Sequence, residues 1–180
     1  TRSAGQIILV TFVPIYARDD VGLGPGFVGV LLALLMGLSL VSQPVLGYLS
    51  DRTSRKGTLL PGTVVLMAVT PLLGLADDTW TLLAVVCVIG PFLFSSAVLL
   101  NALGLDIAPR ELHSSVTAAQ FLTGLALGSA APVIAGAVAA AAGTAAAFYV
   151  AAVLFGVTLA IVLVLPATKG STPTPRFVAR

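Results

Sequence analysis

The run WTLLAVVCVIGPFLFSSAVLLNAL, residues 80–103, indicates the fold class because no charged side chain interrupts it. A helix that crosses a membrane needs about 20 predominantly apolar residues, and this run is longer than that. The whole chain has the same character: 58% of its 180 residues are hydrophobic, 9% are charged, and the mean hydropathy is +1.08. Soluble domains carry about 25% charged residues, so the composition predicts an integral membrane protein.

Five further apolar runs lie on either side of this segment, separated by charged or turn-forming residues. Together they predict an all-α bundle over residues 1–166 with six spanning helices, at residues 4–17, 27–50, 59–76, 80–103, 115–142 and 145–165. The first run is short, and we expect it to be a span whose beginning has been removed. Residues 167–180 are predicted to form a disordered cytoplasmic tail. Kinks are predicted at the prolines Pro14, Pro44, Pro71, Pro91 and Pro132.

The basic residues gather on one side of the predicted bundle. With the amino terminus inside, eight of the nine Lys and Arg residues lie on the inner side, Arg2 among them, and Arg18 lies outside. Cytoplasmic loops are enriched in Lys and Arg. We therefore expect a multi-pass protein of the plasma membrane, bacterial inner membrane in type, with both termini in the cytoplasm. On this assignment no ionisable side chain lies in the middle of a span.

The loop after the second span carries the most informative motif, GYLSDRTSRKGTL at residues 47–59. It resembles the signature G-x-L-a-D-R-x-G-R-[RK]-x-x-L of the major facilitator superfamily. Ser54 stands where the family has glycine, which places the usual positive-φ turn in question. The matching positions are Gly47, Leu49, Asp51, Arg52, Arg55, Lys56 and Leu59.

The resemblance implies one half of a two-part transporter and a gating role for the motif. Asp51 would accept hydrogen bonds at the N-terminus of an adjacent helix, where the helix dipole favours negative charge. Arg52, Arg55 and Lys56 would pair with acidic groups, and Gly47 would allow close helix approach. The simpler interpretation is a positive-inside anchor. The polar basic end, the start that looks cut and the fourth span without arginine favour the second, C-terminal half.

The fifth predicted span repeats small residues and a proline at every fourth position. This spacing places them on one helical face, where small residues let two helices approach closely. The pattern also loosely resembles the superfamily's antiporter motif, with Ala131 and Ala135 in place of glycines. We favour the packing interpretation for Gly124, Gly128, Pro132 and Gly136.

Neutral polar side chains within the spans are candidates for lining a central cavity. The resemblance implies that the first, second, fourth and fifth helices of each half surround that cavity. For each candidate the alternative is a hydrogen bond between helices. The candidates are Gln6, Thr11, Gln43, Ser95, Asn101 and Gln120.

The function implied by the resemblance is secondary transport of small molecules by alternating access, with efflux of a drug or metabolite favoured. The expected partners are the lipid bilayer, the missing six-helix half and a small-molecule substrate. No cofactor, metal or nucleic acid is expected, and the net charge is only +2. A membrane serine protease would need an intramembrane His as base, whereas His113 lies in a loop. The remaining alternative is a stand-alone six-helix scaffold, or a half-transporter that acts as a dimer.

Overall fold

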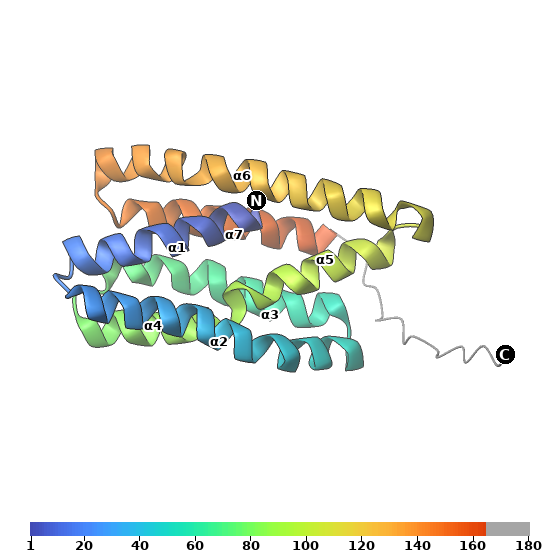
Figure 1. Cartoon of the computed structure of the whole chain (residues 1–180), viewed down its shortest axis with the longest axis horizontal. Helices are drawn as coiled ribbons and strands as arrows, with labels where there is room; N and C mark the ends of the chain where they lie inside the picture. Colours follow the sequence, from blue (N-terminus) through green and yellow to red (C-terminus); the bar gives the residue numbers. More distant parts are fainter. Residues whose placement is uncertain (165–180) are drawn as a thin grey trace.

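The computed structural model describes residues 1–164, so the predicted tail lies outside the described residues. The described chain is a bundle of helices that run along one axis, and successive helices alternate in direction except α4 and α5, which follow one another in a single segment (Figure 1). Two short 3₁₀ helices, η1 (Thr70–Leu75) and η2 (Arg110–Leu112), lie between them. The α-helices are α1 (Arg2–Asp19), α2 (Pro25–Arg52), α3 (Arg55–Val69), α4 (Thr79–Leu93), α5 (Ser95–Ile107), α6 (His113–Ala142) and α7 (Ala146–Val164).

Five helical segments of the described chain are long and apolar enough to cross a membrane. Two of them are composite, because α3 continues into η1 beside Pro71, and α4 continues into α5 after Pro91. The prolines of α1, α2 and α6 lie inside uninterrupted helices. The first predicted span, residues 4–17, is helical within α1, which has 18 residues and carries charges at Arg2, Arg18 and Asp19. The five segments are Pro25–Arg52, Arg55–Leu75, Thr79–Ile107, His113–Ala142 and Ala146–Val164.

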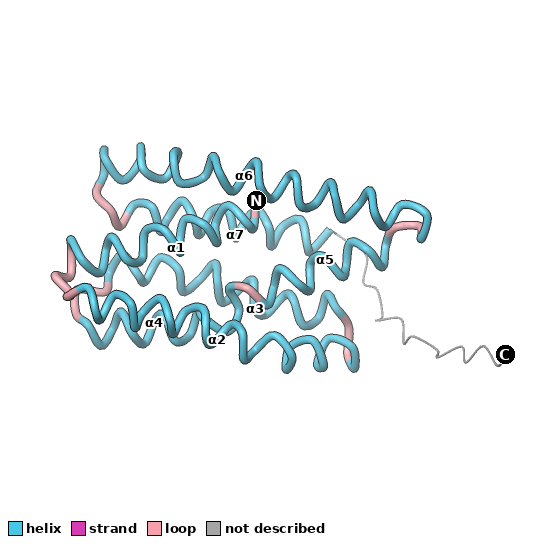
Figure 2. The backbone as a smooth tube through the Cα atoms, viewed as in Figure 1, coloured by secondary structure: helices cyan, strands magenta, loops and turns pink. Residues whose placement is uncertain are grey.

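The amino terminus lies midway along the bundle and not at one of its ends (Figure 2). At 1.5 Å per residue, the 18 residues of α1 extend about 27 Å, whereas the 30 residues of α6 extend about 45 Å. The last turn of α1 is level with the loop that follows α6. The first turn of α1 therefore lies only about midway along the bundle. The prediction that placed Arg2 at the inner surface was therefore wrong.

Helix α1 supplies much of the hydrophobic core because it packs against both α6 and α7. Ile8, Leu9 and Val13 are buried on it, and Tyr16 meets the ring of Phe148 edge-on, with ring centroids 5.4 Å apart. On α7, Phe148 and Phe155 are fully buried. These contacts place the start of α1 in the protein interior.

Glycines allow close packing on the two sides of α1 that face α6 and α7. A side-chain carbon added at Gly128 of α6 would lie 2.5 Å from Ile7 Cδ1, and one at Gly124 would lie 3.2 Å from Ser3 Oγ. Gly136 faces Phe12 at 3.9 Å, so the predicted small-residue face of α6 lies against α1. Pro132 lies one turn from each neighbouring glycine on this helix.

Gly5 provides the corresponding close approach between α1 and α7. An added Cβ there would lie 3.1 Å from the Phe155 ring and 3.3 Å from the carbonyl oxygen of Ala151. Gly29 of α2 is a matched control, because a Cβ there meets nothing within 4 Å. We expect Gly5→Leu to destabilise the protein by about 1–3 kcal/mol through overpacking and Gly29→Leu to have little effect. Thermal unfolding in detergent measures the difference, and equal midpoints for the two variants would contradict this packing.

Candidate functional site

The fourth predicted span is interrupted in its middle, where α4 ends at Leu93 and α5 begins at Ser95. The break lies just after Pro91, which has no N–H to donate to the helix. The N–H of Ala97 bonds to the carbonyl of Phe94 at 3.0 Å, three residues back. The kink predicted at Pro91 is thus a break between two helices, and it leaves the last carbonyls of α4 without helical partners.

Side chains satisfy each of the last four carbonyls of α4. Ser39 donates to Gly90 O, Ser42 and Ser95 donate to Pro91 O, Ser96 donates to Phe92 O, and Arg2 donates to Leu93 O. The Ser95 bond is 2.8 Å long and the Ser96 bond is 2.7 Å long. Unsatisfied backbone groups cost several kcal/mol in a bilayer, so this set of partners is what permits the break.

The serines form one cluster between α2 and the break. Ser39 Oγ also accepts the Phe94 N–H at 3.3 Å, and the hydroxyls of Ser42 and Ser95 lie 2.8 Å apart. Ser39 and Ser95 are each 1% exposed. The structure therefore places Ser95, a predicted cavity-lining residue, in the packed interface with α2.

Arg2 is the basic member of this group and is 5% exposed. Its Nη2 donates to Leu93 O, its Nη1 donates to Gln6 Oε1 at 3.3 Å, and its Nε is buried without a hydrogen-bond partner. Leu93 is the central residue of the segment Thr79–Ile107. A cation at the C-terminal end of α4 is favourable because the helix dipole is negative there. Beyond the shortness of the first apolar run, no sequence feature indicated this position for Arg2.

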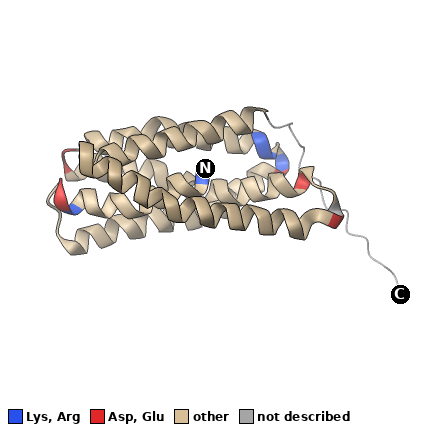
Figure 3. Ribbon diagram, turned by 90° about the horizontal axis from the view of Figure 1, so that it is seen from above, with Lys and Arg blue, Asp and Glu red and all other residues tan. Residues whose placement is uncertain are grey.

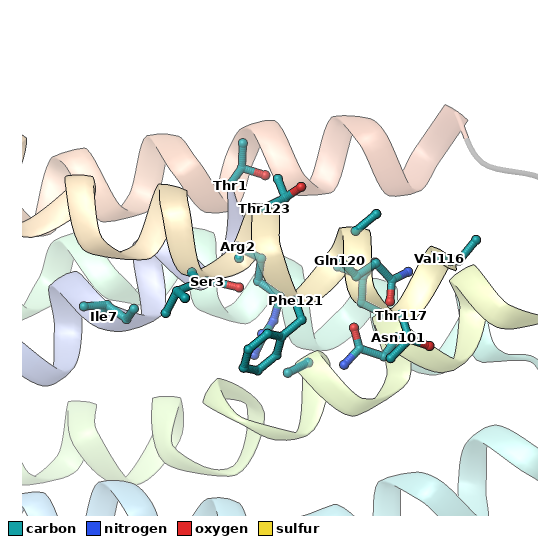
Figure 4. Close-up of a pocket in the computed structure, with 15 residues that line it drawn as sticks. Thr1, Arg2, Ser3, Ile7, Asn101, Val116, Thr117, Gln120, Phe121 and Thr123 are labelled. Carbon is teal, nitrogen blue, oxygen red and sulfur yellow. The ribbon is translucent and has the colours of Figure 1, made fainter. Parts of the chain in front are cut away.

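A cavity of about 660 Å³ lies next to Arg2, between α1, α5 and α6. Figure 4 shows Arg2, Asn101 and Gln120 around it, with Phe121 on the α6 side. Asn101 and Gln120 are two of the predicted cavity residues, and a third, Gln6, holds Arg2. Thr11 and Gln43 are half-buried and lie outside the residues that line this cavity.

The predicted gating motif lies at the end of the bundle where α2 meets α3. Arg55 forms an ion pair with Asp106 at the end of α5, and both side chains are less than one-fifth exposed. Lys56 Nζ donates to the carbonyl of Leu163 on α7 at 2.8 Å. The first residues of α3 are therefore tied to the ends of two other helices.

Leu59 of the motif is buried in a cluster with Leu99, Leu103 and Val162, whereas Arg52 and Ser54 make local contacts. Arg52 lies over the ring of Tyr48, with its Cζ 4.4 Å from the ring centroid. Asp51 is exposed, and a Cβ added at Gly47 meets nothing within 4 Å. Ser54 has φ −153°, so no positive φ is required, and its hydroxyl caps α3 by accepting the Gly57 N–H at 3.0 Å. A cap of this kind explains why serine is suitable at this departure from the family pattern.

Charge is distributed unevenly along the bundle (Figure 3). The acidic positions lie at the two ends, whereas a basic position lies midway, beside the amino terminus. At one end, Asp78 caps α4 by accepting the N–H groups of Trp80 and Thr81 at 3.1 Å. Hydrogen bonds from the Thr81 side chain and backbone lower the pKa of the Asp78 carboxyl.

The serine cluster makes a testable contribution to stability. Ser39→Ala would leave the Phe94 N–H and the Gly90 carbonyl without this partner, at a cost of about 1–3 kcal/mol. Ser129→Ala is the matched control, because that exposed hydroxyl bonds only within its own helix, to Ala126 O. Thermal unfolding of both variants in detergent checks the expectation. Loss of stability in Ser129→Ala of the same size would contradict it.

Comparison with protein families gave one informative result. A model described as the Major Facilitator Superfamily matches residues 2–180. Comparison with curated proteins gave no match. The family match spans almost the whole chain, including the break, the cavity and the charged motif.

Proposed function

Because this chain belongs to the Major Facilitator Superfamily, whose members are transporters and not enzymes, we propose that it is one six-helix half of a secondary transporter. It moves a small molecule by alternating access, in which two halves rock about a site near the bilayer midplane. The observation that carries the proposal is the family match over residues 2–180, together with five helical segments that are long and apolar enough to cross a membrane.

The other half of the transporter is the proposed main partner, with the lipid bilayer around both. We place this chain as the C-terminal half, in a bacterial plasma membrane with both termini cytoplasmic, and we favour efflux of a drug or metabolite. The most apolar stretches of α2 and α6 are only 17% buried, which leaves surface for lipid and for a second half. The α2 surface includes Leu40, Val41 and Val45, and the α6 surface includes Phe121, Leu122 and Val133.

The genomic reading frame separates this assignment from the alternative, a stand-alone half that acts as a dimer or scaffold. Six further predicted spans and a long central loop upstream of Thr1 would support the C-terminal half. A start codon immediately before Thr1 would favour the stand-alone half.

The charged motif supports a gating role at the cytoplasmic end. Asp51 is exposed at the end of α2, where it is available to a helix N-terminus of another half. An anion at a partly buried helix N-terminus contributes up to about 2 kcal/mol. In the intact protein we expect Asp51→Asn to lower transport by about tenfold or more with unchanged membrane expression. Proteoliposome flux measures this, and normal flux would count against the gating role.

The ion pair between Arg55 and Asp106 gives an independent test of the same end of the bundle. Arg55→Glu would place two carboxylates together, and Asp106→Arg would place two cations together. We expect either change to impair transport and the double exchange to recover much of it, with a coupling energy of about 0.5–3 kcal/mol. Additive defects in the double variant would show that the pair does not act as a unit.

A further inference from the structure

The charged motif has serine at position 54, where the family signature has glycine, and it has a glycine three residues later, at Gly57. Ser54 Oγ accepts the N–H of Gly57 at 3.0 Å, so Ser54 is the N-cap of α3. A Cβ added at Gly57 would lie 2.7 Å from that same oxygen. The hydroxyl therefore makes its bond in space that only glycine leaves open, and the two residues are matched to each other.

The first turn of α3 needs this cap because of its charge. Arg55 and Lys56 are the first two residues of the helix, and the first turn has no acidic residue. The helix dipole is positive at this end, so cations are unfavourable there. The cap opposes this effect by satisfying one of the N–H groups that have no partner within the helix. Without the cap we expect the first turn to open.

Hydrogen bonds also hold the residues on either side of Ser54. Thr53 Oγ1 donates to the carbonyl of Leu49 at 2.8 Å and lies 3.2 Å from Thr58 Oγ1. The N–H of Thr58 donates to the carbonyl of Ser54 at 3.0 Å. The end of α2 and the first turn of α3 are thus fastened together around the cap.

The first turn of α3 carries one partner of the ion pair to α5. Arg55 directly follows Ser54 in the sequence and pairs with Asp106 near the end of α5. A first turn that opens carries the backbone of Arg55 with it, so the guanidinium leaves Asp106. The cap at Ser54 is therefore connected to the end of a helix about 50 residues further along the chain.

We propose that Ser54 and Gly57 are a matched pair of positioning residues that hold Arg55 on Asp106, in place of the glycine of the family signature. The pair makes the corner between α2 and α3 rigid, so that the charged motif and the end of α5 move as one body. This inference rests on the proposed gating role of the motif and specifies which residues position it.

The test is hydrogen exchange of the intact protein in nanodiscs, read by mass spectrometry. Two peptides are followed, residues 55–60 at the start of α3 and residues 100–107 at the end of α5. Exchange measures local opening of the helix and requires no substrate. Ser54→Ala should speed exchange in both peptides, by about fivefold in residues 55–60. Ser54→Asn keeps a capping acceptor and should restore slow exchange.

Substitutions at Gly57 test the match between the two residues. Gly57→Ala should act like Ser54→Ala, because the added methyl displaces the hydroxyl, although alanine is ordinarily the better helix former. Combined with Ser54→Ala, the same change meets no hydroxyl and should slow exchange relative to Ser54→Ala alone. Gly156→Ala of α7 is the matched control. Its Cβ would lie 3.4 Å from Met67 Sδ, an ordinary contact, and both peptides should be unchanged.

Asp106→Asn tests whether the cap acts through the ion pair. In this background Ser54→Ala should still speed exchange in residues 55–60 but should have no further effect on residues 100–107. A cap with a purely local role predicts no response of residues 100–107 to Ser54→Ala in either background.

The proposal would be overturned by an unchanged α5 peptide in Ser54→Ala, or by a Gly57→Ala effect that is the same with and without the Ser54 hydroxyl. Flux in the Asp51→Asn variant separates this result from the gating role. Exchange that responds as expected, together with normal flux in Asp51→Asn, would refute the gating role alone. Lost flux in Asp51→Asn, with residues 100–107 insensitive to Ser54, would refute the matched pair alone.

Discussion

The structure depends on one constraint, which is that a helix ending inside a membrane bundle must find partners for its last four carbonyls. Helix α4 ends at Leu93, in the middle of its span, and water is not available there to solvate these groups. The contacts between α2 and α4 follow from this requirement, because Ser39 and Ser42 face the break. So does the position of Arg2, whose guanidinium satisfies the final carbonyl.

The same constraint bears on how α1 packs against its neighbours. The start of α1 is held at mid-depth by its contacts with α6 and α7, and Gly5 and Gly128 allow those helices to approach it. The same close packing brings Arg2 to the cavity wall beside neutral amides. Arg2 thereby satisfies the last carbonyl of α4.

Periodic and compositional signals predicted the helices well because each span must be long and apolar, and each boundary carries charge, glycine or proline. These signals did not predict how the helices pack against one another. Pro91 indicated a kink, but the complete break depends on serines from α2 that are distant in sequence. Arg2 was misplaced because a basic residue before an apolar run is normally assigned to the surface, and burial at mid-depth depends on the register of α1 against its neighbours. The cap formed by Ser54 could not be predicted without the geometry of the loop between α2 and α3.

The break at Phe94 also divides the segment Thr79–Ile107 into two helical units. The α4 unit is fastened to α2 by the hydroxyls of Ser39 and Ser42, and the α5 unit contacts α2, α3 and α6, with Ser95 bonded to Ser42. Tilting one unit against the other stretches side-chain hydrogen bonds, which contribute about 0.6 kcal/mol each in membrane proteins, and does not require an intact helix to bend. Arg2 connects α1 to the last residue of α4, Leu93, next to the break. Any force that draws the guanidinium aside therefore acts directly on the angle between the two units.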